Sequence, residues 1–237
     1  MMYGLDLFSG CGGITFALKQ YIRPVAYCDK DHYAQATLLS RMEDGDIPRA
    51  PIWDDVCTLN GTHLPRVVDI IYGGFPCQDI STAGHGKGLA GERSGLFYEI
   101  MRLVKEINPP FVFLENVPAI RSRGLREVVR QFTDLGYDCR WTCLSAREVG
   151  APHLRKRWFF LAHTNSDGLG KQATPSQEEG RIWRPEATPP ISDWRTDMSH
   201  LRRVDDGIPF RMDRVKAMGN GVVPEQVKQA FERLLGK

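Results

Sequence analysis

Residues 3–21, YGLDLFSGCGGITFALKQY, join an apolar run, three glycines and a helix-like segment without a break. The apolar run predicts a buried strand. Glycines at 10, 12 and 13 allow a tight turn and a close approach of the backbone to a ligand. A strand-to-helix turn that only needs glycine for its geometry is the alternative. No Gly-Lys-Ser/Thr follows, so the loop is not a P-loop.

The same order of strand and helix recurs through the first 165 residues. This alternation predicts an α/β fold with a mainly parallel sheet and helices on both faces. Residues 163–210 are rich in Pro, Gly, Ser and Thr and predict a loop-rich insertion. A last helix is expected over 225–235, ended by Gly236. The further expected strands are 24–29, 52–56, 69–75, 111–116, 141–145 and 157–163, and the further helices are 14–21, 32–42, 96–107 and 125–136.

Composition narrows the class of protein. Hydrophobic residues make up 42% of the 237 and charged residues 25%, which is typical of a soluble globular protein. The sequence has no apolar run of the roughly 18 residues that a membrane span needs and no signal-peptide pattern, so we expect a cytoplasmic protein. Its six cysteines lack CxxC spacing, which favours a reducing compartment. Cys139 and Cys143 are the nearest pair, but no second pair accompanies them, so no metal site is predicted.

Charge is distributed unevenly. Residues 1–118 carry 10 Lys and Arg against 14 Asp and Glu, a balance of −4, whereas residues 119–237 carry 21 against 15, a balance of +6. The arginines of RSRGLREVVRQ and HLRKRW could face phosphates, although basic helix surfaces are usually only solvated. The charge pattern is mild support for a polyanionic partner.

The stretch DIIYGGFPCQDIS, residues 69–81, places Cys77 just beyond the end of an expected strand. In open α/β sheets, ligands bind beyond the carboxyl ends of the strands. A free cysteine is more often a small buried hydrophobe, so this position alone does not separate packing from nucleophilic chemistry.

Carboxylates and arginines stand at other strand ends. Asp29 follows the glycine loop by about twenty residues, where an acid can accept ribose hydroxyls, and Asp54 and Asp55 end another short strand; each is alternatively a helix cap. Glu115 follows Val-Phe-Leu, so partial burial would raise its pKa and let it deliver a proton, unless it only caps the next helix. Arg155 and Arg157 alternate on a strand and would project from one face.

These blocks resemble the DNA cytosine-5 methyltransferases, which use S-adenosylmethionine. The resemblance rests on DLFSGCGG, GGFPCQDIS, FLENVP, HLRKRWFFLA and MGNGVVPEQV, in the family's order, and covers residues 3–162 and 211–235. It implies a Rossmann-like class I methyltransferase fold. It also implies that Cys77 is the nucleophile that adds to carbon 6 of cytosine, that Glu115 holds ring nitrogen 3 and supplies a proton, and that Arg157 binds the base carbonyl with support from Arg155.

The resemblance also implies ligand contacts. A base must be flipped out of duplex DNA to be reached, and the glycine-rich loop 82–95 is suited to closing over it. Position 30 is Lys where the family often has an apolar or aromatic residue, which predicts weaker cofactor binding, and His153 stands where glutamine is usual. The implied cofactor contacts are Asp6, Phe8, Gly10, Gly12, Gly13, Asp29, Lys30, Asp55, Pro76 and Asn220, and the implied substrate contacts are Gln78, Ser81, Lys87, Arg93 and His153.

The domain division follows from the blocks: residues 1–162 form the catalytic and cofactor-binding unit, 163–210 a short target-recognition insertion, and 211–237 a segment that returns to the catalytic unit. The insertion is much shorter than is usual in the family, which predicts a short target sequence or relaxed specificity. Two alternatives remain: a tRNA cytosine-5 methyltransferase, and a nucleic-acid-binding subunit that needs a protein partner to recognise its target.

Overall fold

The computed structural model describes residues 1–64, 68–76, 95–164 and 221–236. Seven strands form one sheet in the order β3-β2-β1-β4-β5-β7-β6. The strands are β1 Met2–Leu7, β2 Ile22–Cys28, β3 Ile52–Trp53, β4 Ile70–Gly74, β5 Phe111–Asn116, β6 Tyr137–Ser145 and β7 Lys156–Thr164. The helices are α1 Gly13–Leu18, α2 His32–Glu43, α3 Gly95–Ile107, α4 Ile120–Arg123, α5 Leu125–Thr133 and α8 Pro224–Leu235, with 3-10 turns η1 Gly61–His63 and η4 Ala146–Val149.

The sheet is mostly parallel, as predicted. Strands β1 to β5 pair in parallel, whereas β7 runs antiparallel to both β5 and β6. The carboxyl ends of β1, β2, β4 and β5 therefore meet at one edge, and the amino end of β7 lies at the same edge. Loops from five different parts of the sequence converge there, which is where an α/β sheet binds ligands.

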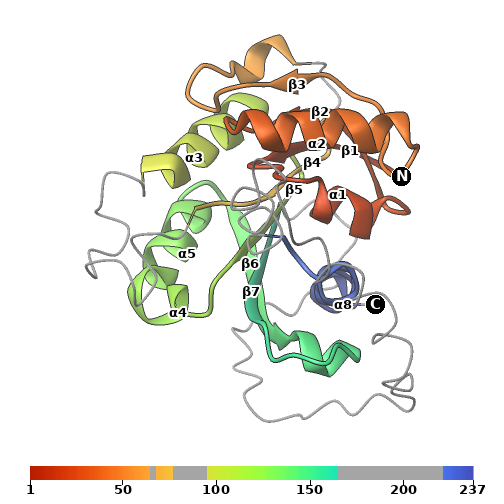
Figure 1. Cartoon of the computed structure of the whole chain (residues 1–237). Helices are drawn as coiled ribbons and strands as arrows, with labels where there is room; N and C mark the ends of the chain where they lie inside the picture. Colours follow the sequence, from red (N-terminus) through yellow and green to blue (C-terminus); the bar gives the residue numbers. More distant parts are fainter. Residues whose placement is uncertain (65–67, 77–94, 165–220, 237) are drawn as a thin grey trace.

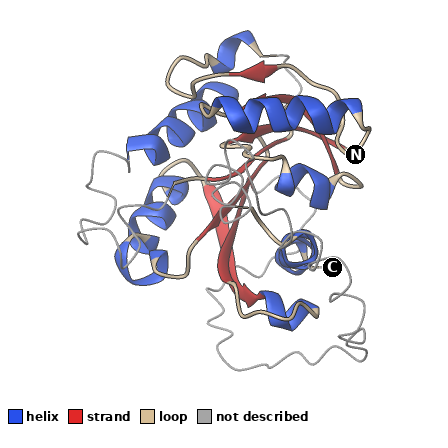
Figure 2. Ribbon diagram, viewed as in Figure 1, coloured by secondary structure: helices blue, strands red, loops and turns tan. Residues whose placement is uncertain are grey.

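Helices cover both faces of the sheet (Figures 1 and 2). On one face, α1 and α8 bury an aromatic and aliphatic cluster against the sheet, centred on Phe113, Phe159 and Phe231. On the other face, α3, α4 and α5 pack onto the larger cluster. Helix α2 packs beside α1 through Leu38 and Met42. Burial of apolar side chains on both faces explains the continuous apolar runs of the central strands.

The predicted elements are present with shifted ends. Strand β6 begins at Tyr137, four residues before the predicted 141, because it pairs along its whole length with β7. Helix α1 ends at Leu18 rather than 21, since the chain turns there and Met2 donates a backbone hydrogen bond to the Tyr21 carbonyl. Strand β7 continues to Thr164, two residues beyond the predicted end of the catalytic unit, and most of the 163–210 insertion lies outside the described residues.

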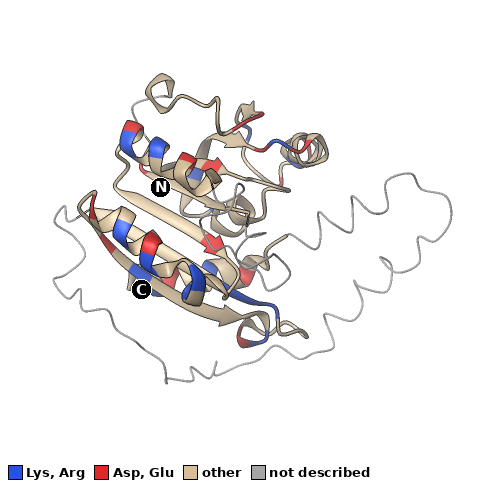
Figure 3. Cartoon of the chain, turned by 90° about the vertical axis from the view of Figure 1, so that its left-hand side faces the viewer, with Lys and Arg blue, Asp and Glu red and all other residues tan. Residues whose placement is uncertain are grey.

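Charges on the described helices are mixed in sign (Figure 3). On α5, Arg130 pairs with Glu127 and with Asp134, so this arginine of the basic segment is neutralised within its own helix. In the part of the chain that the structure describes, no helix is both long and apolar enough to cross a membrane.

Candidate cofactor and catalytic site

The glycine turn after β1 is held in place by the end of β2. Ser9 Oγ accepts a hydrogen bond from the backbone of Cys28 at 3.1 Å and donates one to the Asp6 carbonyl at 2.9 Å. Gly10 and Gly12 have φ of 53° and 73°, left-handed values that favour glycine. A Cβ at Gly10 would meet no atom of the described residues within 4 Å, so within this part of the chain the backbone borders open space.

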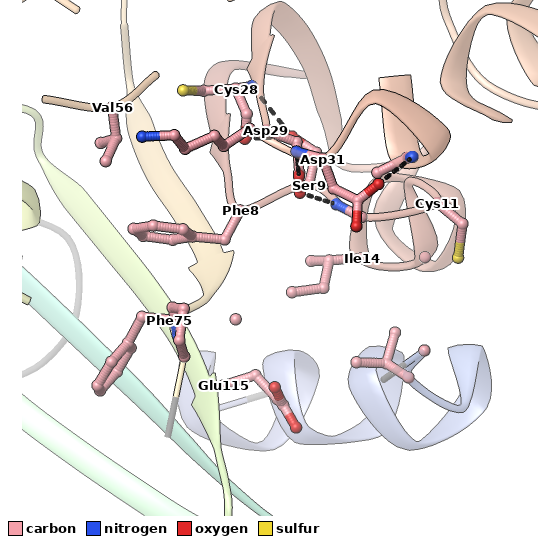
Figure 4. Close-up of a pocket in the computed structure, with 18 of the residues that line it drawn as sticks. Phe8, Ser9, Cys11, Ile14, Cys28, Asp29, Asp31, Val56, Phe75 and Glu115 are labelled. Carbon is pink, nitrogen blue, oxygen red and sulfur yellow. Dashed lines mark hydrogen bonds between the residues drawn. The ribbon is translucent and has the colours of Figure 1, made fainter. Parts of the chain in front are cut away.

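The Asp29 carboxylate is oriented by the backbone around it. It accepts hydrogen bonds from Gly10 N at 2.7 Å and from Asp31 N at 2.9 Å (Figure 4). Asp31 in turn caps α2 by accepting from Tyr33 N and Ala34 N. The cap of α2 is therefore Asp31 and not Asp29, whose carboxylate faces the glycine turn.

Lys30 and Asp55 form an ion pair across the neighbouring loops. Lys30 Nζ lies 2.9 Å from Asp55 Oδ2, and the other Asp55 oxygen accepts from Cys57 N. The hydrogen bond from Lys30 lowers the pKa of Asp55, so this carboxylate is ionised near neutral pH. Lys30, at the position where the family often has an apolar or aromatic residue, therefore occupies one oxygen of Asp55, an implied cofactor contact.

Glu115, which is buried, and Arg157, which is partly buried, form the ion pair of the site. Glu115 is 9% exposed at the end of β5, and its Oε1 lies 2.8 Å from Arg157 Nε at the start of β7. Burial raises the pKa of Glu115 above its ordinary value, while the charges of Arg157 and Arg155 oppose that shift. A carboxyl group so placed can hold a proton at higher pH than an exposed glutamate, as the sequence predicted.

Arg155 binds the backbone of the segment that follows residue 220. Its Nη2 donates to the Gly221 carbonyl, and its own carbonyl accepts from the side-chain amide of Gln226 on α8. Burial lowers the pKa of the Arg155 guanidinium. These contacts bring the segment after residue 220 back to the catalytic unit, where a Cβ at Gly13 would lie 2.8 Å from Val222 Cγ2.

A cavity of about 540 Å³ connects these groups (Figure 4). This volume is in the range of sites for drug-sized ligands and cofactors. His153 is exposed ahead of β7, and together with Asp6, Gly12 and Arg155 it does not line the cavity. Cys77, Gln78, Ser81, Lys87, Arg93 and Asn220 lie outside the described residues. The predicted residues that do line the cavity are Phe8, Gly10, Gly13, Asp29, Lys30, Asp55, Pro76, Glu115 and Arg157.

Other residues at this edge were not singled out from the sequence. Asn116 donates from Nδ2 to the Phe75 carbonyl at 3.2 Å, which fixes the backbone that leads into Pro76 and Cys77. Val56, Leu96 and Val222 give the cavity apolar walls. A polar residue directly after the buried Glu115 was the only available signal for Asn116.

Cys139 and Cys143 pack against the larger core cluster. Burial raises the pKa of the Cys139 thiol to about 12. Within the four described ranges, no group of three or more His, Cys, Asp or Glu side chains is placed to hold a metal ion.

Asp6 belongs to a buried polar chain beneath the glycine turn. Thr15 Oγ1 donates to Asp6 Oδ2 at 2.6 Å and lies 2.7 Å from the Tyr72 hydroxyl. Asp6 is 1% exposed, and its Oδ1 has no hydrogen-bond partner among the residues that the structure describes. Burial raises the pKa of Asp6 from 3.8 to about 7, with the hydrogen bond from Thr15 opposing that shift. The Asp6 carboxyl group thus links strand β1 to helix α1, which follows the glycine turn.

This shift predicts a pH dependence of stability. A raised pKa means that the folded state binds the proton more tightly, so the contribution is complete below pH 4 and is lost as pH rises through 7. We expect the free energy of unfolding to fall between pH 4 and 8 by up to about 4 kcal/mol. Asp6→Asn should be less stable at pH 4 but lack most of this slope. Urea denaturation of both proteins across this pH range measures it, and equal slopes would contradict the assignment.

Comparisons with known proteins identify the family of the sequence. Residues 2–206 match the model of the C-5 cytosine-specific DNA methylase family. The type II methyltransferase M.CviJI of Paramecium bursaria Chlorella virus IL3A is 33% identical over 97% of this chain and 58% of its own length. M.HhaI of Haemophilus parahaemolyticus is 33% identical over 68% of this chain and 49% of its own length. The chain thus spans about half the length of the curated relatives it matches.

Solved structures share the fold. The methyltransferase EhMeth of Entamoeba histolytica superposes with a TM-score of 0.61 over 88% of this chain and 61% of its own, at 16% identity. The Dnmt2 methyltransferase of S. pombe superposes with a TM-score of 0.57 over 77% of this chain and 59% of its own, at 22% identity. The family match over most of the sequence leads to one assignment: the chain belongs to the C-5 cytosine-specific DNA methylase family.

Proposed function

We propose that this protein transfers a methyl group from S-adenosylmethionine to carbon 5 of cytosine in DNA. The observation that carries the proposal is the Glu115–Arg157 ion pair, which lines the same cavity as the glycine turn and Asp29. This reaction requires a general acid beside the cytosine and a binding site for the nucleoside part of the cofactor. The cavity offers a candidate for each.

The residues present fit the cofactor. The turn at Phe8 and Gly10 offers open backbone, and the oriented Asp29 carboxylate suits ribose hydroxyls. Asp55 also lines the cavity, where it would accept a hydrogen bond from an adenine amine. Bound here, S-adenosylmethionine supplies an electrophilic methyl group. Asn220, from the expected late block, is assigned to the same pocket by resemblance.

The chain's own groups would carry the cytosine chemistry. The Cys77 thiolate adds to carbon 6 and forms a carbon–sulfur bond, while Glu115 donates its proton to ring nitrogen 3 so that negative charge does not accumulate on the ring. Arg157 binds the base carbonyl and stays paired with Glu115. Transfer of the methyl group to carbon 5 would leave S-adenosylhomocysteine. The carbon 5 proton then passes to solvent, the carbon–sulfur bond breaks so that Cys77 leaves as its thiolate, and Glu115 takes back the proton from ring nitrogen 3, which releases neutral 5-methylcytosine. Gln78, Ser81, Lys87, Arg93 and His153 are proposed to contact the flipped nucleotide and its backbone.

The proposal is tested by mass spectrometry of nucleosides. The purified chain is incubated with S-adenosylmethionine and, separately, with duplex DNA, single-stranded DNA and tRNA. 5-Methylcytosine in duplex DNA is the expected result, and the map of methylated sites then shows how specific the 163–210 insertion is. Methylation of tRNA alone would overturn the substrate assignment. Methylation of none of them would favour a chain that needs a protein partner.

The Lys30–Asp55 pair predicts competition with the cofactor. Lys30→Met frees Asp55 Oδ2 for the adenine amine, so we expect the Kd for S-adenosylmethionine to fall by about threefold, a typical effect of an exposed ion pair. Added salt should tighten binding to the wild type, because it screens the competing pair, and should not tighten binding to the variant. Isothermal titration calorimetry measures both. Lys105→Met, an exposed lysine of α3 that does not line the cavity, is the control; weaker binding to Lys30→Met would contradict the prediction.

A further inference from the structure

The segment from Asp55 to Gly61 is fastened to helix α3 by polar contacts. Arg102 donates from Nη2 to the Val56 carbonyl at 2.8 Å and from Nη1 to the Leu59 carbonyl at 2.9 Å. One helical turn farther along, Glu106 Oε2 accepts from Gly61 N at 2.8 Å. Three backbone groups of one short segment are thus bound by two side chains of α3.

This segment carries one wall of the cavity. Asp55, Val56 and Cys57 line it, and the Asp55 carbonyl accepts from Thr58 N and Leu59 N in a single tight turn. The carbonyls that Arg102 binds therefore belong to the same turn as the Asp55 carboxylate. Arg102 itself does not line the cavity.

Arg102 is held in position by acids on both sides along its helix. Its Nε lies 2.7 Å from Glu99 Oε2 and its Nη1 lies 2.9 Å from Glu106 Oε1. The planar guanidinium can serve two carboxylates and two carbonyls at once, which a lysine ammonium on a flexible chain does not reproduce. Val56 and Leu59 are buried in the same core cluster as α3, so the segment packs closely on the helix. Gly61 also lies tightly there, since a Cβ would approach Ile107 Cγ1 to 2.8 Å.

We propose that Arg102 is a positioning residue for the cofactor: it fixes the Asp55–Leu59 turn on α3 and so sets the place of the Asp55 carboxylate in the cavity. This inference rests on the proposed function for its ligand, but the clamp itself is a property of the chain. Helix α3 also contributes Leu96 to the cavity wall. The helix therefore joins two parts of the wall, one directly and one through Arg102.

Helix α5 offers a matched control. Arg130 has the same arrangement of acids, with Glu127 three residues before it and Asp134 four residues after it. Among the described residues, the side-chain hydrogen bonds of Arg130 stay within this helix and its cap, and none reaches the cavity segment. Arg102→Met and Arg130→Met thus remove equivalent ion pairs, and only the first removes the two bonds to the Val56 and Leu59 carbonyls.

The first measurement is hydrogen exchange of the full chain without cofactor, followed by mass spectrometry of the peptide that covers residues 54–64. Arg102→Met should raise the exchange rate of this peptide about tenfold or more, because the turn loses its attachment. Arg130→Met should leave the rate unchanged. Equal exchange in the two variants would overturn the clamp, whatever ligand the cavity binds.

The second measurement is the affinity for S-adenosylmethionine and the rate at saturating cofactor. Arg102→Met should weaken binding about tenfold with kcat within about twofold of the wild type, Arg102→Lys should recover only part of the loss, and Arg130→Met should bind normally. A loss of kcat with unchanged affinity would overturn the positioning role. If the wild type binds no S-adenosylmethionine, the proposed function fails while the exchange result still decides the clamp. Glu99→Gln, which keeps both bonds to the carbonyls, provides a milder variant should Arg102→Met fold poorly, and its affinity should stay near that of the wild type.

Discussion

Glu115→Gln is expected to lower the turnover of cytosine by about 10²- to 10⁴-fold, the usual contribution of a positioned acid or base. Glutamine has the same shape, and its carbonyl can still accept the hydrogen bond from Arg157 Nε that holds Glu115 at 2.8 Å. It cannot deliver a proton to ring nitrogen 3. The loss should therefore fall on the chemical step, while the Kd for S-adenosylmethionine stays within about twofold.

Single-turnover methylation of duplex DNA measures this effect without interference from product release. Cys77→Ser sets the floor of the assay, because serine lacks the thiolate that the proposed adduct requires. Arg130→Met provides a structural reference outside the cavity. If Glu115→Gln kept a tenth or more of the wild-type rate, Glu115 would not be the group that supplies the proton. Residual methylation by Cys77→Ser would contradict the covalent adduct between Cys77 and carbon 6.

The pH dependence of the wild type should agree with this role. Burial raises the pKa of Glu115, although Arg157 and Arg155 oppose the shift. The protonated fraction of the acid decreases as pH rises above that pKa, so the rate of the step that needs its proton should decrease in the same direction. Glu115→Gln carries no proton at this position and should lack this limb of the profile. A shared limb in both proteins would assign the titration to another group.

Much of the fold could be predicted from the sequence, because its signals are local. The apolar runs that became β4 and β5 are buried on both faces, and such runs are typical of central parallel strands. The glycine turn and Asp29 were placed at one edge because parallel strands end on the same side. The antiparallel insertion of β7 between β5 and β6 is a long-range pairing, and no local pattern encodes it.

Contacts between distant segments were less predictable for the same reason. Lys30 was expected to weaken the site by the absence of an aromatic ring, whereas the structure pairs it with Asp55, 25 residues away. Asp6 was expected at the cofactor and instead lies beneath the turn, because the alternation of a strand directs it toward Thr15 and Tyr72. Arg102 resembles any exposed helical arginine in the sequence, since its partners at 56 and 59 are backbone carbonyls.

Gly73→Ala should unfold much of the protein or destabilise it by at least about 3 kcal/mol, in the range of severe overpacking. A Cβ at Gly73 would lie 2.0 Å from the Leu7 carbonyl oxygen, and Gly73 is paired with Leu7 at the end where β1 and β4 meet the cavity. The obstacle is backbone in the centre of the sheet, so it cannot turn aside. The two strands would have to separate, with loss of their last contacts and of the support for the glycine turn.

The neighbouring Gly74→Ala should behave differently, although the two residues are adjacent. Its Cβ would lie 2.7 Å from Glu115 Oε2, the far end of a flexible side chain, so the carboxylate can move and the strand need not. We expect a loss of stability below about 1 kcal/mol together with a clear loss of turnover, because Glu115 is displaced from its contact with Arg157. Gly95→Ala, where a Cβ meets nothing within 4 Å at the start of α3, is the control and should be at least as stable as the wild type. Urea denaturation of the three variants, with Gly95→Ala as the control for stability alone, and single-turnover rates of Gly73→Ala and Gly74→Ala separate the two mechanisms. An active, stable Gly73→Ala would show that β1 and β4 are not this close. A fully active Gly74→Ala would show that Glu115 does not need its position.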